Sequence, residues 1–354
     1  MISRLELINF TAFGHLNIEF SPKINIIIGE NGTGKTHLLK AAYAMGIGQH
    51  LLSSDPEIDS DDLTTRLTTE FIQIFLPLDE RLGKLHHHGA TENAVLVADH
   101  PLDGTLSVSL HNNSRNIAIR ERPHHSSRTG EPVFIPTKEV LSFMKGFTSL
   151  YEKYELSFDK TYQDLCISLD LPSVRIETLS PKSIWAMEEI KDICGGTFIF
   201  HGGGKVTFRT DRNEYSANVM AEGFRKLGVL SRLLETGTIQ PGRSGPLFWD
   251  EPEASLNPKL MTTLVEILLE LSRNGQQIIV ATHDYVLLKC FHQQMDVGKE
   301  DSVLFHSLYL DQESKAVQVS STDDFYGVRP NPIDDAYGSL IDRDIEISMG
   351  SLGK

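Results

Sequence analysis

The chain has 354 residues, of which 40% are hydrophobic, and its formal net charge is −15. It is long enough to bury a large core in one domain or in two closely joined ones. The acidic balance argues against a general electrostatic grip on nucleic acid, although a local basic groove is still compatible with it. Cys166, Cys194 and Cys290 have no CxxC spacing, which excludes a disulfide framework and a cysteine zinc site.

No stretch of the sequence approaches the roughly 18 consecutive apolar residues needed to span a membrane. The N-terminus M-I-S-R-L-E-L-I-N-F alternates between apolar and polar residues, so it does not have the pattern of a signal peptide. We therefore expect no membrane association and a location in the reducing cytoplasm.

Residues 2–28 predict strands, because apolar residues alternate up to Phe20 and an apolar run then ends at Ile28. The next residues, 29–36, fit the template G-x-x-x-x-G-K-[ST]. In this phosphate loop, glycines allow tight turns that aim backbone N–H groups at a phosphate, and the following helix adds its positive end. The loop predicts a nucleoside triphosphate site with these residues: Gly29, Glu30, Asn31, Gly32, Thr33, Gly34, Lys35, Thr36 and His37.

Residues 51–195 have a less regular pattern and predict an inserted α/β region, helical from about residue 137. It starts with an acidic segment, 55–62, which we expect to be a loop. Further on, the alternating residues 105–110 are expected to pair with residues 117–120. The flanking parts, 1–50 and 196–354, are expected to form one ATPase domain.

Strands and helices alternate after Thr197, which indicates a largely parallel sheet covered by helices. A helix is expected over 222–235, a buried strand over 246–249, a helix over 258–273 and a strand over 277–281. We expect the C-terminal strands and the acidic segment 334–346 to complete the same fold.

Two adjacent acids follow the strand that ends at Trp249. An apolar strand that ends in a carboxylate places Asp250 beside the phosphate loop, where it can hold Mg²⁺ together with Thr36. Glu251 points elsewhere and is placed to accept a proton from an attacking water. Adjacent acids in a turn are usually only solvated charge, but the upstream phosphate loop makes the catalytic interpretation the better one.

Histidines occur in three settings. His283 follows a buried strand in the segment A-T-H-D, residues 281–284, so it can contact a γ-phosphate or orient Glu251. His86–His88 and the pair His124 and His125 lie in polar stretches without a carboxylate pattern, so we interpret them as solvated residues rather than metal ligands.

The order of these motifs resembles a known family. The phosphate loop, A-E-G-F from residue 221, D-E-P-E-A-S-L-N-P over residues 250–258 and A-T-H-D over residues 281–284 together are similar to the ABC-type ATPase head of RecF, SMC and overcoming-lysogenisation proteins. The start, N-F-T-A-F-G over residues 9–14, resembles the RecF/SMC branch more than transporter subunits. More narrowly, residues 221–228 and 282–289 resemble compact antiphage ATPases, including abortive-infection, Septu-like and retron-associated proteins. The resemblance implies a P-loop α/β fold that binds ATP and Mg²⁺.

The resemblance also implies roles for individual residues. Lys35 and Thr36 would grip phosphate and metal, Asp250 would hold the metal, Glu251 would be the general base and His283 would sense the γ-phosphate. The signature segment, Ala221–Gly223, would cap the nucleotide of a second copy through Glu222 and Gly223. Residues 255–257 match the segment that faces the partner, so a head-to-tail dimer with two composite sites is implied, and larger assemblies stay open.

Two positions depart from the family pattern or are hard to place. A serine usually stands at Ala221 and bonds the γ-phosphate. Here that bond must come from backbone N–H groups, Arg225 or Lys226, which implies weaker or differently built activation. The glutamine that senses nucleotide in the family is hard to place, and Gln73 is a candidate.

Three functions remain open at this point. The first is an ATPase switch that dimerises on ATP and controls a separately encoded effector, expected to be a nuclease, in antiphage defence. About 70 residues follow His283, too few for the nuclease domain that overcoming-lysogenisation proteins carry. The second is a RecF-like repair ATPase that binds DNA directly, which the negative charge disfavours. The third is a transporter subunit, which the insertion and the altered signature segment disfavour.

Overall fold

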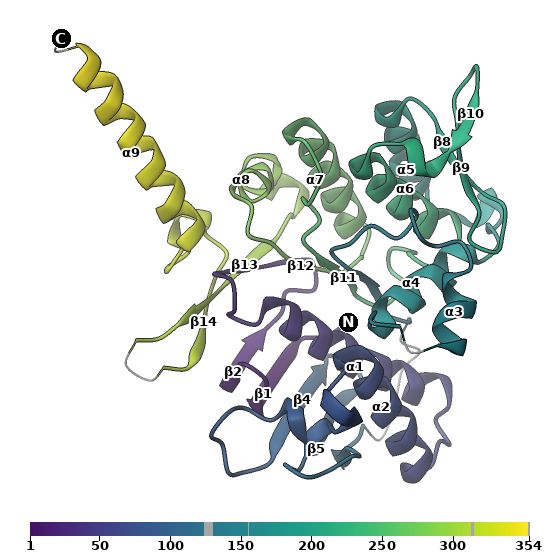
Figure 1. Ribbon diagram of the computed structural model, residues 1–354, viewed down its shortest axis with the longest axis vertical. Helices are drawn as coiled ribbons and strands as arrows, with labels where there is room; N and C mark the ends of the chain where they lie inside the picture. The colour runs from purple at the N-terminus through teal and green to yellow at the C-terminus, as the bar shows by residue number, and fades with distance from the viewer. Residues whose placement is uncertain (124–129, 155, 313–314, 353–354) are drawn as a thin grey trace.

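The computed structural model describes residues 1–123, 130–154, 156–312 and 315–352, which form three sheets and flanking helices (Figure 1). The strands are β1 Arg4–Phe10, β2 Phe13–Glu19, β3 Ile24–Gly29, β4 Ala94–His100, β5 Gly104–Leu110, β6 Ala118–Glu121, β7 Val133–Ile135, β8 Thr197–Phe200, β9 Val206–Arg209, β10 Glu214–Ser216, β11 Leu247–Asp250, β12 Ile278–Ala281, β13 Val303–Leu310 and β14 Val317–Thr322. The α-helices are α1 Lys35–Ser54, α2 Ser60–Phe75, α3 Phe147–Lys153, α4 Lys160–Asp170, α5 Pro181–Cys194, α6 Glu222–Glu235, α7 Pro258–Arg273, α8 Tyr285–Gln294 and α9 Pro332–Leu352.

The central sheet has the order β14-β13-β3-β12-β11-β7 in the described part of the chain. All neighbours pair in parallel except β13 and β14, which are antiparallel. Every residue of β3, β11 and β12 is buried, which explains why their sequences are apolar except for Asn25 in β3 and Asp250 at the end of β11. Gly29, Asp250 and Ala281 are the last residues of β3, β11 and β12. Because parallel strands have their carboxyl ends on the same side of a sheet, these residues lie together at one edge, formed by the carboxyl ends of the strands.

A second, antiparallel sheet has the order β2-β1-β4-β5-β6 within the described residues. Helix α1 lies between the two sheets, since it contacts β3, β11 and β12 on one side and β4 and β5 on the other. Its apolar residues, including Leu38, Leu39 and Met45, are fully buried there. The helix that carries the phosphate loop is therefore fixed by packing on both sides.

Residues 51–195 contribute to both of these sheets. Strands β4–β6 extend the sheet that β1 and β2 begin, with Leu7 opposite Leu96, and β7 pairs with β11 in the central sheet. The predicted pairing of residues 105–110 with 117–120 is confirmed by the antiparallel β5–β6 pair. The acidic segment 55–62 is not entirely a loop, because α2 begins at Ser60 and the Asp59 side chain accepts a hydrogen bond from the Asp62 N–H.

Helices α3–α6 and the small sheet β10-β9-β8 form a helical lobe beside β7, and its buried residues share one hydrophobic core with the central sheet (Figure 1). Helices α7 and α8 pack together, and α5 packs against both α6 and α7. The predicted helices over 222–235 and 258–273 are confirmed as α6 and α7. Helix α7 begins where predicted because the Asn257 side chain accepts the Leu260 N–H and Pro258 occupies the first turn.

Helix α9 projects from the body at the opposite end of the central sheet (Figure 1). The Tyr337 ring stacks on the Tyr285 ring at a centroid distance of 4.4 Å, and beyond it Leu340, Ile341 and Met349 are exposed. The expectation for residues 334–346 is therefore corrected: β13 and β14 do complete the central sheet, but the acidic segment forms an exposed helix. Among the described residues, no helix is both long and apolar enough to cross a bilayer.

Candidate nucleotide-binding site

The phosphate loop connects β3 to α1 at the edge of the central sheet. Gly34 precedes the helix with φ of 89°, and a Cβ atom there would lie 2.8 Å from Phe13 Cζ, so the position requires glycine. Glu30, Asn31, Gly32, Thr36 and His37 are exposed or partly exposed. The loop and the first turn of α1 thus present backbone N–H groups at a surface where an anion can bind.

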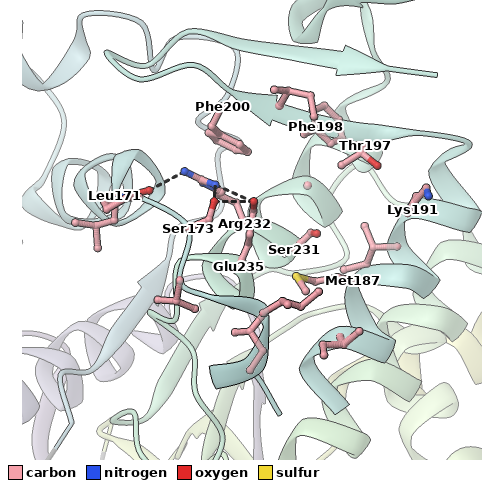
Figure 2. Close-up of a pocket in the computed structure, with 18 of the residues that line it drawn as sticks. Leu171, Ser173, Met187, Lys191, Thr197, Phe198, Phe200, Ser231, Arg232 and Glu235 are labelled. Carbon is pink, nitrogen blue, oxygen red and sulfur yellow. Dashed lines mark hydrogen bonds and ion pairs between the residues drawn. The ribbon is translucent and has the colours of Figure 1, made fainter. Parts of the chain in front are cut away.

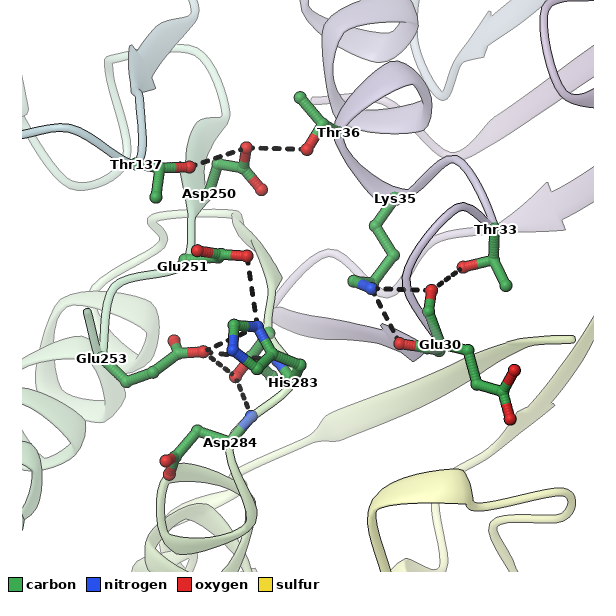
Figure 3. Close-up of polar contacts among 12 residues, drawn as sticks. Glu30, Thr33, Lys35, Thr36, Thr137, Asp250, Glu251, Glu253, His283 and Asp284 are labelled. Atoms are coloured by element: carbon green, nitrogen blue, oxygen red, sulfur yellow. Dashed lines mark hydrogen bonds and ion pairs between the residues drawn. The ribbon is translucent and has the colours of Figure 1, made fainter.

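Lys35 extends into the centre of the loop. Its Nζ atom donates to the carbonyl oxygens of Gly29 at 2.7 Å and of Glu30 at 3.1 Å (Figure 3). Burial lowers the pKa of Lys35, although Glu251 and Asp250 oppose that effect. A buried cation that carbonyl oxygens hold within an exposed loop is positioned to bind phosphate oxygens.

Asp250 is held by two hydroxyl groups. Its Oδ2 atom accepts hydrogen bonds from Thr36 Oγ1 at 2.9 Å and from Thr137 Oγ1 at 3.1 Å (Figure 3). Burial raises the pKa of Asp250 above its usual value, and these two hydrogen bonds only partly oppose that shift. Hydroxyl and carboxylate oxygens at this spacing are ligands of the kind that Mg²⁺ prefers, so the residues present fit that ion.

Glu251 lies directly after Asp250 and faces His283. Its backbone φ is 50°, in the left-handed region, and its N–H donates to the Ala281 carbonyl at 2.9 Å. Its Oε1 atom lies 3.2 Å from His283 Nδ1 (Figure 3). Both side chains are partly exposed, so the pair lies at the surface of the phosphate site, where a water molecule can reach it.

Two further site residues escaped the sequence reasoning. Thr137 follows β7, whose place beside β11 could not be predicted from its three residues. Glu253 is 6% exposed and accepts hydrogen bonds from Thr282 Oγ1 at 2.7 Å and the His283 N–H at 3.3 Å. Burial raises the pKa of Glu253. It fixes the backbone next to His283, and its place in D-E-P-E was the only signal for it.

The signature segment lies at the start of α6. Ala221 and Glu222 are exposed, and Ala221 supplies no side-chain cap. The suggestion that Arg225 or Lys226 replaces the missing serine is corrected. Arg225 is paired with Glu139 at 2.7 Å, and Lys226 is 2% exposed with its Nζ on the Glu251 carbonyl. Of the donors proposed to replace the serine hydroxyl, the backbone N–H groups at the start of α6 therefore remain.

Other predicted candidates fall in different places. Gln73 is half-buried within α2. His86 Nδ1 and His87 Nδ1 bond backbone carbonyl oxygens, and no metal-binding group of three or more His, Cys, Asp or Glu residues occurs among the described residues. His124 and His125 lie outside the described residues.

A cavity of about 700 Å³ lies elsewhere, in the helical lobe between α5, α6 and β8 (Figure 2). Apolar side chains such as Met187 and Phe198 line it, while the Arg232 guanidinium bonds Leu171, Ser173 and Glu235 at its side. None of the residues of the phosphate site lines this cavity, so it is a separate feature.

Comparison with protein families gives two matches. Residues 149–289 match the family described as "AAA domain, putative AbiEii toxin, Type IV TA system", and residues 4–56 match an AAA domain. The fold and the phosphate loop thus define a P-loop ATPase domain.

Individual proteins agree with this class. The chain is 40% identical over 67 residues to the DNA replication and repair protein RecF of Psychromonas ingrahamii, which covers 18% of this chain and 19% of that protein. With RecF of Idiomarina loihiensis the identity is 50% over 48 residues, or 14% of each chain. The chain thus matches less than a fifth of the length of these relatives.

The fold is that of an SMC head. A solved SMC head bound to the C-terminal winged-helix domain of ScpA superposes with a TM-score of 0.53 and 15% identity, over 91% of this chain and 97% of that one. Taken together, the matches support the RecF/SMC group of ABC-type ATPases.

Proposed function

We propose that this protein binds ATP with Mg²⁺, dimerises on it and hydrolyses it. The observation that carries the proposal is the convergence at one sheet edge of Lys35 and Thr36 after β3, Asp250 and Glu251 after β11 and His283 after β12. Thr36 and Asp250 are 214 residues apart in sequence, yet the sheet brings them into contact. A phosphate-binding cation, two metal ligands and a candidate base therefore lie together.

Each of these residues has a proposed role in this reaction. Lys35 grips the β- and γ-phosphate oxygens, Thr36 and Asp250 hold Mg²⁺, and Glu251 takes the proton of the attacking water. Mg²⁺ neutralises phosphate charge when it is bound. His283 lies 3.2 Å from Glu251, so it orients the base. We propose that it also senses the γ-phosphate, as the resemblance to the ATPase family implies.

The proposed dimer is head to tail. Glu222 and Ser255 are exposed, and a Cβ atom on Gly223 would lie 2.7 Å from the Ser255 carbonyl oxygen, so the signature segment and residues 255–257 lie together at the surface. A second copy that docks there would place its phosphates against the N-terminus of α6, whose N–H groups favour anions.

We further propose that this ATPase switches a separately encoded effector, a nuclease, in antiphage defence in the cytoplasm. Two observations support this role: the matched family description names an AbiEii toxin, and the net charge of −15 disfavours direct DNA binding. A RecF-like repair function with direct DNA binding is the second candidate, which the RecF matches favour.

The test is to purify the protein alone and with the product of an adjacent gene, and to measure ATPase and nuclease activity with and without duplex DNA. Nuclease activity that appears only in the complex and requires ATP supports the effector switch. Strong DNA stimulation of the lone protein supports the repair function instead. Absence of ATP hydrolysis under every condition would contradict both.

A further inference from the structure

Two adjacent basic side chains of α6, Arg225 and Lys226, connect the start of this helix to the catalytic edge of the sheet. Both follow the signature segment by one turn, yet both are turned into the protein, with exposures of 12% for the Arg225 side chain and 2% for Lys226. A long cationic side chain is buried only when specific partners hold it, so their partners indicate a purpose.

Lys226 reaches the backbone of Glu251. Its Nζ atom donates a hydrogen bond to the Glu251 carbonyl oxygen at 3.0 Å. The same carbonyl also accepts the Ala254 N–H at 3.2 Å. Burial lowers the pKa of Lys226, and the surrounding acids Glu253, Glu222, Glu251 and Asp250 oppose that effect. The cation thus lies among the acids of the site and bonds the backbone of the candidate base.

The backbone of Glu251 needs such support. A φ of 50° is unfavourable for a residue with a Cβ atom. A strained backbone persists only when its surroundings hold it, and the direction of the Glu251 carboxylate depends on that backbone. Loss of the Lys226 hydrogen bond would let the peptide relax and would move the carboxylate away from the water it must activate.

Arg225 is connected to Asp250 indirectly, through Glu139 and the turn after β7. Its Nε atom lies 2.7 Å from Glu139 Oε2, and the Glu139 Oε1 atom accepts the Ser142 N–H at 3.1 Å. This ion pair holds the turn after β7. Two residues earlier in that turn, Thr137 donates to the Oδ2 atom of Asp250. The position of this metal-ligand carboxylate is therefore linked to α6 through Arg225.

We propose that Lys226 and Arg225 are positioning residues that link the signature segment to Glu251 and Asp250. A partner nucleotide that contacts Glu222 and Gly223 then acts on the base and the metal ligand of the copy that supplies the signature segment. The inference rests on the proposed ATP hydrolysis. It implies that ATP hydrolysis at the two sites of a dimer is coupled.

The main test compares Lys226→Met with Lys226→Arg. We expect Lys226→Met to lower kcat by tenfold to about 100-fold, because small misplacements of a catalytic group have effects of this size. Nucleotide Kd should stay within about threefold of the wild-type value. Lys226→Arg keeps a donor and should recover most of the rate. In a Glu251→Gln background, Lys226→Met should cause no further loss, since both changes act through the same group.

Arg232→Met is the matched control. It removes another buried cation of α6, whose bonds go to the carbonyl oxygens of Leu169 and Leu171 and to the side chains of Ser173 and Glu235. We expect it to lower Tm while kcat is retained. Unchanged kcat in Lys226→Met, or a further loss of rate in the Glu251→Gln background, would overturn the role of Lys226.

The Arg225 arm is tested through metal dependence. The neutral pair Arg225→Gln with Glu139→Gln avoids an unpaired buried charge. We expect it to raise the Mg²⁺ concentration for half-maximal ATP binding about threefold. An unchanged Mg²⁺ requirement would remove Arg225 from the inference.

One readout does not depend on hydrolysis. In the nucleotide-free protein, hydrogen–deuterium exchange of residues 250–257 should be faster in Lys226→Met than in the wild type and should return to normal in Lys226→Arg. If the wild type does not hydrolyse ATP, the proposed function fails, but this comparison still decides whether Lys226 holds Glu251. Equal exchange in all three proteins would contradict the inference by itself.

Discussion

The phosphate loop and the signature segment differ in how much of their surroundings the chain supplies. Helix α1 lies between two sheets, and Thr36 is bonded to Asp250 at 2.9 Å across 214 residues of sequence. The start of α6 has Ala221 and Glu222 exposed and no side-chain cap. Under the proposed function, the binding half of the site is therefore built within one copy, and the closing half is presented to a second copy.

The largest effect is expected at the boundary of the two halves, at Glu251. Glu251→Gln removes the base but keeps the size of the side chain, so hydrolysis should fall by about 10²–10⁴-fold while ATP stays bound and the dimer accumulates. Single-turnover kinetics and analytical ultracentrifugation with ATP measure both. Glu266→Gln, on the exposed side of α7, is the control. Hydrolysis at the wild-type rate would show that Glu251 is not the base.

Lys35→Ala tests the binding half alone. Removal of the buried cation should weaken ATP binding by about 100-fold or more, because a charge-assisted bond to phosphate is lost. Titration with a fluorescent ATP analogue measures the change, and Lys182→Ala, which breaks a peripheral pair with Glu270, should leave affinity unchanged. If affinity is retained in Lys35→Ala, the loop does not bind phosphate as proposed.

Low pH should destabilise the central sheet next to the phosphate loop. His306 lies on β13 opposite Ile27 of β3, is fully buried between Ser321 and Asn25, and burial lowers its pKa from 6.5 to about 3. Below pH 6.5 the unfolded chain binds a proton that the folded protein does not. The free energy of unfolding should therefore fall by up to about 1.4 kcal/mol per pH unit down to about pH 3.

Urea unfolding at several pH values measures this slope, and His306→Gln should make it shallower. A second buried histidine with a low pKa, His100 at about 4, contributes to the slope with the same sign and is present in both proteins. Equal slopes in wild type and His306→Gln would mean that His306 is protonated without loss of the fold.

The smallest effect is expected in the closing half. Ala221→Ser adds a hydroxyl where a partner's γ-phosphate is proposed to bind, and it should raise dimer-dependent hydrolysis about threefold, the size of one ordinary hydrogen bond. Ala221→Asp is the control, because Asp caps the helix as well as Ser does but repels phosphate. If both variants speed hydrolysis equally, the gain comes from the helix cap and not from a contact in the second copy.

Local patterns were sufficient for much of the fold. The bounds of α6 and α7 follow from helical periodicity, and α7 also follows from Asn257 and Pro258 at its start. The buried strands around the phosphate loop follow from their apolar runs. Helix α2 was missed because its first acids, Asp61 and Asp62, resemble a loop, although acids favour the N-terminal turn of a helix.

The site was predictable where a motif lies within one segment. Lys35, Thr36, Asp250, Glu251 and His283 meet as expected, since each closely follows or ends a buried strand. Thr137 and the inward direction of Lys226 depend on which strands and helices become neighbours. That order is set by tertiary packing over long sequence separations, which no local pattern contains.

The left-handed backbone of Glu251 sets stability against activity at one residue. An asparagine adopts that conformation more easily than glutamate does, so Glu251→Asn would relieve part of the strain. It would also remove the carboxylate. If Glu251 is the proposed base, stability and hydrolysis favour different residues at this position.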